Sequence, residues 1–152
     1  MSSAPSIEEL ATRLSALEDE RAILRTLYQY GHSIDYGLEE SWVDCFTDDG
    51  IFDVRMRNGE PFMRYEGRQK LHEMVAEHTR PPVAYHKHLI AEPVIDVEGD
   101  TAKVDTYFAR LDSPDDGGDA VVTAIGRYRD EFVRSPDGRW RIRIRLAEIQ
   151  NR

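Results

Sequence analysis

The sequence predicts an α+β domain in which helices cover a long, curved, mainly antiparallel sheet. Apolar residues of the N-terminal part recur three or four positions apart, as in amphipathic helices, whereas the part after Val83 is rich in Val, Ile, Tyr and Phe. A sheet of this length tends to coil, and helices packed on its concave side leave a cone-shaped barrel whose mouth can hold a ligand.

The first expected helix covers residues 7–35, as one unit or as two joined helices. Ser6 and Glu9 have the spacing of a capping box, leucines recur at steps of three, four and seven residues, and Gly37 ends the segment. Residues 1–6 are expected to be a loose leader. The chain has 152 residues, 40% of them hydrophobic, which suits one core, so we expect a single domain over residues 7–152.

Two shorter helices and a hairpin are expected next. Residues 39–46 place Trp42, Val43 and Phe46 on one side of a short helix. Residues 51–56 alternate as a half-buried strand does, and Asn58-Gly59 is a hairpin turn. A third helix follows Gly67 and ends before Pro81-Pro82.

Four long strands complete the chain. They are expected at residues 84–97, 101–112, 120–134 and 139–149, with turn-forming sequences at 98–100, 114–118 and 135–138. Long strands joined by short turns are typical of an antiparallel meander.

The composition argues against two classes of partner. Aspartate and glutamate outnumber lysine and arginine by 29 to 20, and the formal net charge of -9 repels nucleic acid and anionic membranes. No apolar run approaches the roughly 20 residues that cross a bilayer, and no secretory signal is visible. The single cysteine, Cys45, cannot form an intramolecular disulfide, so we expect a soluble, cytoplasmic protein.

Several local patterns, in this order, resemble the SnoaL-like group of the nuclear-transport-factor-2-like superfamily. They are the sequence from Tyr30 to Asp35, Trp42 with Phe46–Gly50, His86-Lys-His88, and Gly126–Asp130 followed by Asp137–Ile142. The group includes polyketide cyclases, scytalone dehydratase, bile-acid dehydratase and hexachlorocyclohexane dehydrochlorinase. The resemblance spans about residues 8–146 and implies the cone-shaped fold, but this scaffold also hosts isomerases, hydrolases and binding domains.

The resemblance implies a catalytic pair, with His88 as the general base and Asp35 as its orienting carboxylate. Lyases of this group remove a proton next to a leaving group or a carbonyl. An imidazole suits this task because its ordinary pKa of about 6.5 leaves much of it neutral. A buried carboxylate fixes its tautomer and stabilises the imidazolium that forms.

Two further residues are implied as substrate contacts, His86 and Tyr30. Residues two apart on a strand project from the same face, so His86 and His88 point into the same space; either could be the base, and we prefer His88. Tyr30 takes the place of a tyrosine or lysine that touches substrate in the resembled proteins. On an ideal helix it lies about 140° from Asp35, so geometry alone favours Tyr28.

Arg145 is the last implied substrate contact, five residues after Trp140. A guanidinium there would stabilise negative charge on an enolate oxygen or a leaving group. Arginines at 139, 141, 143 and 145 alternate with apolar residues, however, which is also typical of a strand with one solvated face.

No metal or other cofactor is expected. His86, His88 and Asp35 together offer two imidazoles and a carboxylate, a set that can bind a metal, but the resembled lyases work without one. His72 and His78, six residues apart on the third expected helix, lie on different faces and cannot form an i, i+4 metal pair.

The leading prediction is therefore a cofactor-free lyase or isomerase, of the dehydratase or cyclase type, that acts on a small hydrophobic ring compound and forms a homodimer or homotrimer. One alternative is a non-enzymatic module for ligand binding or dimerisation on the same fold. Another is the small subunit of a ring-hydroxylating oxygenase. The paired Asp35 and His88 argue against both alternatives.

Overall fold

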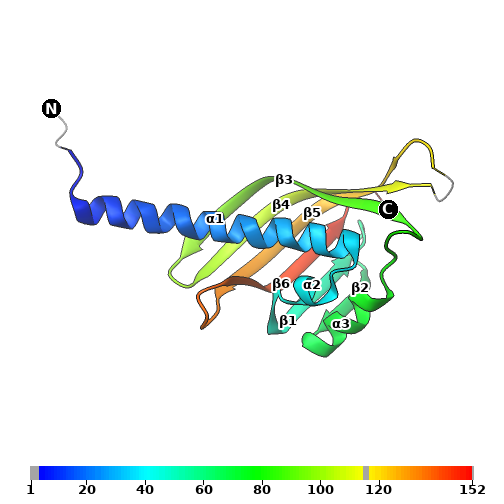
Figure 1. The fold of residues 1–152 in the computed structure, drawn as a ribbon, viewed down its shortest axis with the longest axis horizontal. Coiled ribbons are helices and arrows are strands. Elements are labelled where there is room, and N and C mark those ends of the chain that lie inside the picture. Colours follow the sequence, from blue (N-terminus) through cyan, green and yellow to red (C-terminus); the bar gives the residue numbers. More distant parts are fainter. Residues whose placement is uncertain (1–3, 115–116, 152) are drawn as a thin grey trace.

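The computed structural model describes residues 4–114 and 117–151, which form three helices and a six-stranded sheet (Figure 1). The helices are α1 (Ile7–Tyr36), α2 (Glu39–Val43) and α3 (Arg68–Glu77). The strands are β1 (Phe46–Arg55), β2 (Pro61–Glu66), β3 (Tyr85–Glu98), β4 (Thr101–Ser113), β5 (Val121–Arg134) and β6 (Trp140–Ile149). Of the predicted leader and the predicted 114–118 turn, residues 1–3 and 115–116 lie outside the described residues.

The strand order of the sheet is β2-β1-β6-β5-β4-β3. Strands β3 to β6 pair antiparallel with one another, which confirms the predicted meander, and β1 is antiparallel to β2. The pair β1–β6 is parallel, so the sheet is mixed. The sheet is not closed, and the cone-shaped α+β fold is confirmed.

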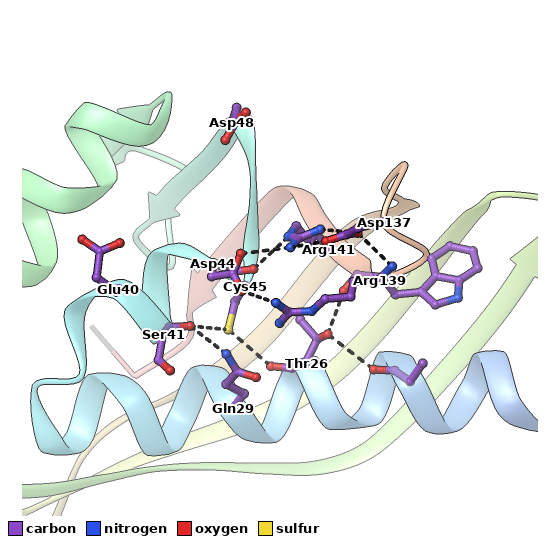
Figure 2. Close-up of polar contacts among 12 residues, drawn as sticks. Thr26, Gln29, Glu40, Ser41, Asp44, Cys45, Asp48, Asp137, Arg139 and Arg141 are labelled. Carbon is purple, nitrogen blue, oxygen red and sulfur yellow. Dashed lines mark hydrogen bonds and ion pairs between the residues drawn. The ribbon is translucent and has the colours of Figure 1, made fainter.

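The second helix is shorter than predicted, because the chain after Val43 pairs with β6 rather than continuing as a helix. The backbone N–H of Ile142 donates to the carbonyl oxygen of Cys45, 2.8 Å away. Figure 2 shows Arg139 and Arg141, at the start of β6, reaching the carboxylate of Asp44. These contacts hold residues 44 and 45 in a turn beside β6, and Phe46 begins β1.

Helix α1 is one continuous helix rather than two joined helices. Ser6 and Glu9 form the predicted capping box. Its core-facing residues are Ile23, Leu27, Tyr30 and Ile34. Leu10, Leu14 and Leu17, expected on the same apolar face, are exposed instead. The N-terminal part of α1 projects past the edge of the sheet, where there is nothing for these leucines to pack against (Figure 1).

Helices α2 and α3 lie together near the C-terminal end of α1 and contact each other, while α3 also contacts β1 and β2. They close one end of the space between α1 and the sheet. No helix in the described part of the chain is long and apolar enough to cross a membrane.

Candidate active site

A cavity of about 190 Å³ lies between α1, α3 and the concave face of the sheet. Its walls are mostly apolar, with Phe52 and Phe108 among them. Five side chains bring polar atoms to the lining: Tyr30, His78, His88, Arg110 and Tyr128. Because a cavity of about 150 Å³ holds benzene, this space suits a molecule with one ring.

Asp35 and His88 form a tightly bonded pair at the wall of this cavity. The Nδ1 atom of His88 lies 2.6 Å from Oδ1 of Asp35. The backbone N–H of His88 also donates to both carboxylate oxygens, at 3.2 and 3.1 Å. Since the carboxylate accepts these bonds, Nδ1 carries a proton, and the neutral form of the ring has its lone pair on Nε2.

A glycine lets the two residues approach. Gly31, one turn before Asp35, lies so close to β3 that a Cβ atom there would come within 3.1 Å of the carbonyl oxygen of His88. Few real Cβ contacts are this short, so the strand would have to move away from the helix to admit a side chain. The glycine therefore sets the spacing at which the Asp35 carboxylate meets the His88 backbone.

His86 lies beside the pair, as predicted from its position on the strand. Its Nε2 atom is 3.7 Å from Oδ1 of Asp35, its side chain is fully buried, and it is not part of the cavity lining. Neither ring nitrogen has a hydrogen-bond partner among the described residues. Burial, reinforced by the neighbouring His88, lowers the pKa of His86, so this imidazole is neutral at pH 7.

His78 lines the cavity as well, which no sequence pattern predicted. It follows the last turn of α3, and its ring centre lies 4.7 Å from that of His86 and 5.7 Å from that of His88. Its Nδ1 atom donates to the carbonyl oxygen of Thr79 at 3.0 Å. Burial and the two nearby imidazoles lower the pKa of His78 to about 4. The chain after α3 folds back to β3, and this return, not helix periodicity, brings His78 to the cavity.

Tyr30 lines the cavity, whereas Tyr28, which ideal helix geometry favoured, is 54% exposed on the outer side of α1. The buried face of this helix turn is broad enough to include both Tyr30 and Asp35. Burial raises the pKa of Tyr30 and of Tyr128, so both phenols are protonated and can donate a hydrogen bond.

Arg145 is fully buried but does not line the cavity. Its Nε and Nη2 atoms donate to Asp130 at 2.9 and 2.6 Å, and neither side chain is exposed. The guanidinium carbon lies 4.1 Å from the ring centre of Tyr30 and 4.0 Å from that of Tyr128. The two rings therefore stand beside a buried cation, and Arg145 reaches a ligand in this cavity only through them.

A β-bulge accounts for the orientation of Arg145. Glu131 pairs with Ile144 and Phe132 with Ile142, so Arg143 is an extra residue on β6. Such a residue reverses the alternation of the strand. Arg143 points to solvent and Arg145, two residues later, points inward. The interpretation of these arginines as one solvated face of the strand is therefore wrong for Arg145.

Arg110 is a cavity residue that the sequence analysis missed. It is directly opposite His88 in the β3–β4 pairing. Its Nε and Nη2 atoms both bond to Oδ1 of Asp112, at 3.0 and 2.9 Å. Arg110 therefore brings a guanidinium to the cavity wall, and the carboxylate of Asp112 balances its charge.

Asp35, His86 and His88 are also the residues that could hold a metal ion. One ligand atom from each lies within 4.8 Å of the others. Two imidazoles and a carboxylate suit several divalent transition metals. A metal bound to Nδ1 of His88 would displace the proton that this nitrogen shares with Asp35, whereas a metal bound to Nε2 would leave that bond in place.

Comparisons with known proteins agree with the fold. A family model described as a SnoaL-like domain matches residues 15–145. No curated protein matches the chain in sequence. An NTF2-like protein with a cystatin-like fold from Novosphingobium aromaticivorans covers 98% of this chain and 93% of its own, with 23% identity and a TM-score of 0.83.

Two further solved structures come from the same organism. The β subunit of a candidate aromatic-ring-hydroxylating dioxygenase shares 26% identity, with a TM-score of 0.78 over 91% of this chain and 93% of its own. A candidate scytalone dehydratase shares 20% identity, with a TM-score of 0.70 over 88% of this chain and 85% of its own. The second of these likenesses is evidence for the fold alone.

Proposed function

Because this chain belongs to the family of SnoaL-like domains, we propose that it is a lyase or isomerase that uses His88, oriented by Asp35, as a general base. The observation that carries the proposal is the 2.6 Å contact between Nδ1 of His88 and Asp35 at the wall of an apolar cavity. This contact directs Nδ1 toward the carboxylate, so that Nε2 is the nitrogen that would take a proton from a substrate.

In the proposed reaction, Nε2 of His88 removes a proton from a carbon next to a carbonyl or a leaving group. The electron pair of the broken C–H bond forms an enolate or expels the leaving group with its bonding electrons. The imidazolium, stabilised by Asp35, then returns the proton to the departing oxygen in a dehydration, or to another carbon in an isomerisation. Such a base contributes on the order of 10²- to 10⁴-fold in rate.

Tyr30 is the proposed donor to the substrate oxygen, with Tyr128 beside it. Both phenols are protonated, line the cavity and lie against the buried cation of Arg145, which favours donation to a developing negative charge. Arg145 then acts as a positioning residue for the tyrosines. His86, buried behind His88, acts on the catalytic pair rather than on the substrate.

The cavity supports a small hydrophobic substrate with one ring and an oxygen or halogen substituent. Its volume admits one ring and its lining is mainly apolar and aromatic. We propose that no cofactor takes part, so a chelator leaves turnover unchanged. The buried single cysteine, Cys45, fits a reducing compartment, which supports a cytoplasmic location.

The test is a panel of hydroxylated, halogenated and ketonic single-ring compounds, incubated in D₂O with the wild type and with His88→Ala. Proton removal by His88 exchanges deuterium into the substrate even when the final product is unknown. We expect exchange or product with at least one compound in the wild type and its loss in the variant. Equal exchange in both proteins would contradict the proposal.

A second candidate function is that of a small subunit in a larger oxygenase, and the likeness to a candidate dioxygenase β subunit supports it. This function predicts that the chain purifies with a larger partner and that Asp35→Asn leaves the partner's activity intact. The first proposal predicts catalysis by this chain alone, so the two are distinguished by assaying the isolated protein.

A further inference from the structure

The first turns of α1 carry an apolar stripe that nothing in the described chain covers. The exposed fractions of Ile7, Leu10, Leu14 and Leu17 are 86%, 49%, 57% and 64%. Figure 1 shows this part of α1 extending beyond the sheet. A helical segment as short as the one from Ile7 to Leu17 is marginal in water without tertiary contacts, so its stripe of four large apolar residues calls for a covering surface.

The stripe has the period of a coiled coil. Its residues alternate at steps of three and four, and the same steps lead on to Arg21, Leu24 and Tyr28. Ile7, Leu14, Arg21 and Tyr28 then take the a positions, and Leu10, Leu17 and Leu24 the d positions. At about 100° per residue, the exposed stripe is centred about 150° around the helix from the core-facing residues. A second helix can therefore lie along it without meeting the sheet.

A surface hollow continues the stripe toward the body of the protein. It has a volume of 670 Å³ and lies between α1 and α2, with Leu24, Tyr28 and Leu38 among its walls. Tyr28 and Leu38 are both 54% exposed. Stripe and hollow lie on one side of α1 over residues 7–28, and the polar walls of the hollow include Arg21, Arg25 and Gln29.

The charges beside the stripe complement a second copy of the same helix. Arg13 and Glu20 take the g positions of successive heptads. In an antiparallel pair, g residues face g residues, so Arg13 of each copy meets Glu20 of the other. Opposite charges at such positions favour the pairing, whereas like charges would oppose it.

We propose that the chain self-associates through an antiparallel pair of α1 segments. With Leu14 opposite Leu17 of the second copy, Leu10 faces Arg21 and Ile7 faces Leu24. The N-terminal end of each helix therefore reaches the hollow of the other copy. A parallel pair would instead place Arg21 of one copy against Arg21 of the other. The repulsion between these two charges in the seam exceeds the small stabilisation that exposed ion pairs give. This association is independent of the catalytic pair.

The first test is the mass of the protein in solution, measured by sedimentation equilibrium. Leu14→Glu places a charge in the middle of the seam and is expected to halve the mass of the wild-type assembly. Ala16→Glu puts the same charge on the opposite face of the exposed helix and serves as the control. Ala16→Glu should keep the wild-type circular dichroism, and Leu14→Glu should differ from it only by the helical signal of the first turns of α1, which lose their covering surface. A monomeric wild type, or equal masses for the wild type and Leu14→Glu, would overturn the proposal.

Cross-linking tests the orientation. Under mild oxidation, Leu14→Cys chains are expected to form disulfides with Leu17→Cys chains and not among themselves. The native thiol does not interfere, because Cys45 is buried and burial raises its pKa to about 12. Disulfides between two Leu14→Cys chains, or none in the mixture, would rule out the antiparallel pair.

Discussion

The Nδ1 atom of His88 lies 2.6 Å from Oδ1 of Asp35, and the backbone N–H of the same histidine bonds to both oxygens of that carboxylate. The carboxylate thus holds the strand and the imidazole at once. This double attachment, made possible by Gly31, fixes the ring so that its Nε2 end is the one available to a ligand.

Loss of either member of the pair should remove catalysis while leaving the fold. His88→Ala is expected to lower kcat/KM by about 10²- to 10⁴-fold, because the proton acceptor is gone. His32→Ala, on the exposed side of α1, is the control and should match the wild type. The measurement is turnover of a compound found in the D₂O screen, together with the melting temperature. Wild-type turnover by His88→Ala would contradict the assignment.

The stability of the protein should fall as the pH is lowered from about 6.5, in part because of His78. The pKa of His78 is about 4 in the folded chain and about 6.5 when unfolded, so between these values the unfolded state binds more protons. The free energy of unfolding therefore decreases with falling pH, by at most about 1.4 kcal/mol per pH unit for one such group.

His78→Gln removes this contribution while the lowered pKa of His86 remains. Urea unfolding at pH 7 and at pH 5 should show the variant losing less stability than the wild type on acidification. If the free energies of unfolding of the two proteins differ by the same amount at pH 7 and at pH 5, His78 is not shielded from protons in the folded state.

The two acidic neighbours on β5, Asp130 and Glu131, should differ sharply in importance. Asp130→Asn leaves the buried guanidinium of Arg145 without its counter-charge, which typically costs about 3–5 kcal/mol. Glu131→Gln breaks only the exposed pair with Arg143, and exposed pairs contribute about 1 kcal/mol or less. Denaturant unfolding measures both, and similar costs for the two variants would contradict the buried ion pair.

Filling the cavity should abolish ligand binding without disturbing the catalytic pair. Ala124 lines the cavity, and Ala124→Leu adds three carbon atoms to it. Ala109→Leu, on the neighbouring strand β4, is the control because Ala109 is not part of the lining. The rise in melting temperature caused by a bound compound should vanish only in Ala124→Leu. A rise that survives there would place the ligand elsewhere.

Much of the fold could be predicted from the sequence, because long helices and strands with regular turns carry strong local signals. The resemblance to the family implied Asp35 and His88 as a pair, and the structure brings these two residues together. Tyr30 was also implied by the resemblance, against the ideal-helix argument for Tyr28. Ideal helix spacing favours Tyr28 only if the buried face is narrow, whereas the buried face of α1 near Asp35 is wide.

The remaining features depend on tertiary structure that no local pattern encodes. His78 reaches the site because the chain turns back after α3. Arg145 points inward because one extra residue, Arg143, reverses the alternation of β6. The leucines of the first turns of α1 looked like core residues, since periodicity shows that a helix has an apolar face but not whether the sheet extends far enough to cover it.

The most direct test of the account is the tautomer of His88, read from its ¹⁵N NMR resonances at neutral pH. We expect Nδ1 to carry the proton and Nε2 to carry none, and we expect Asp35→Asn to shift the ring toward the other tautomer. A wild-type His88 protonated at Nε2 would contradict the account, because the nitrogen on the cavity side could then take no proton from a substrate.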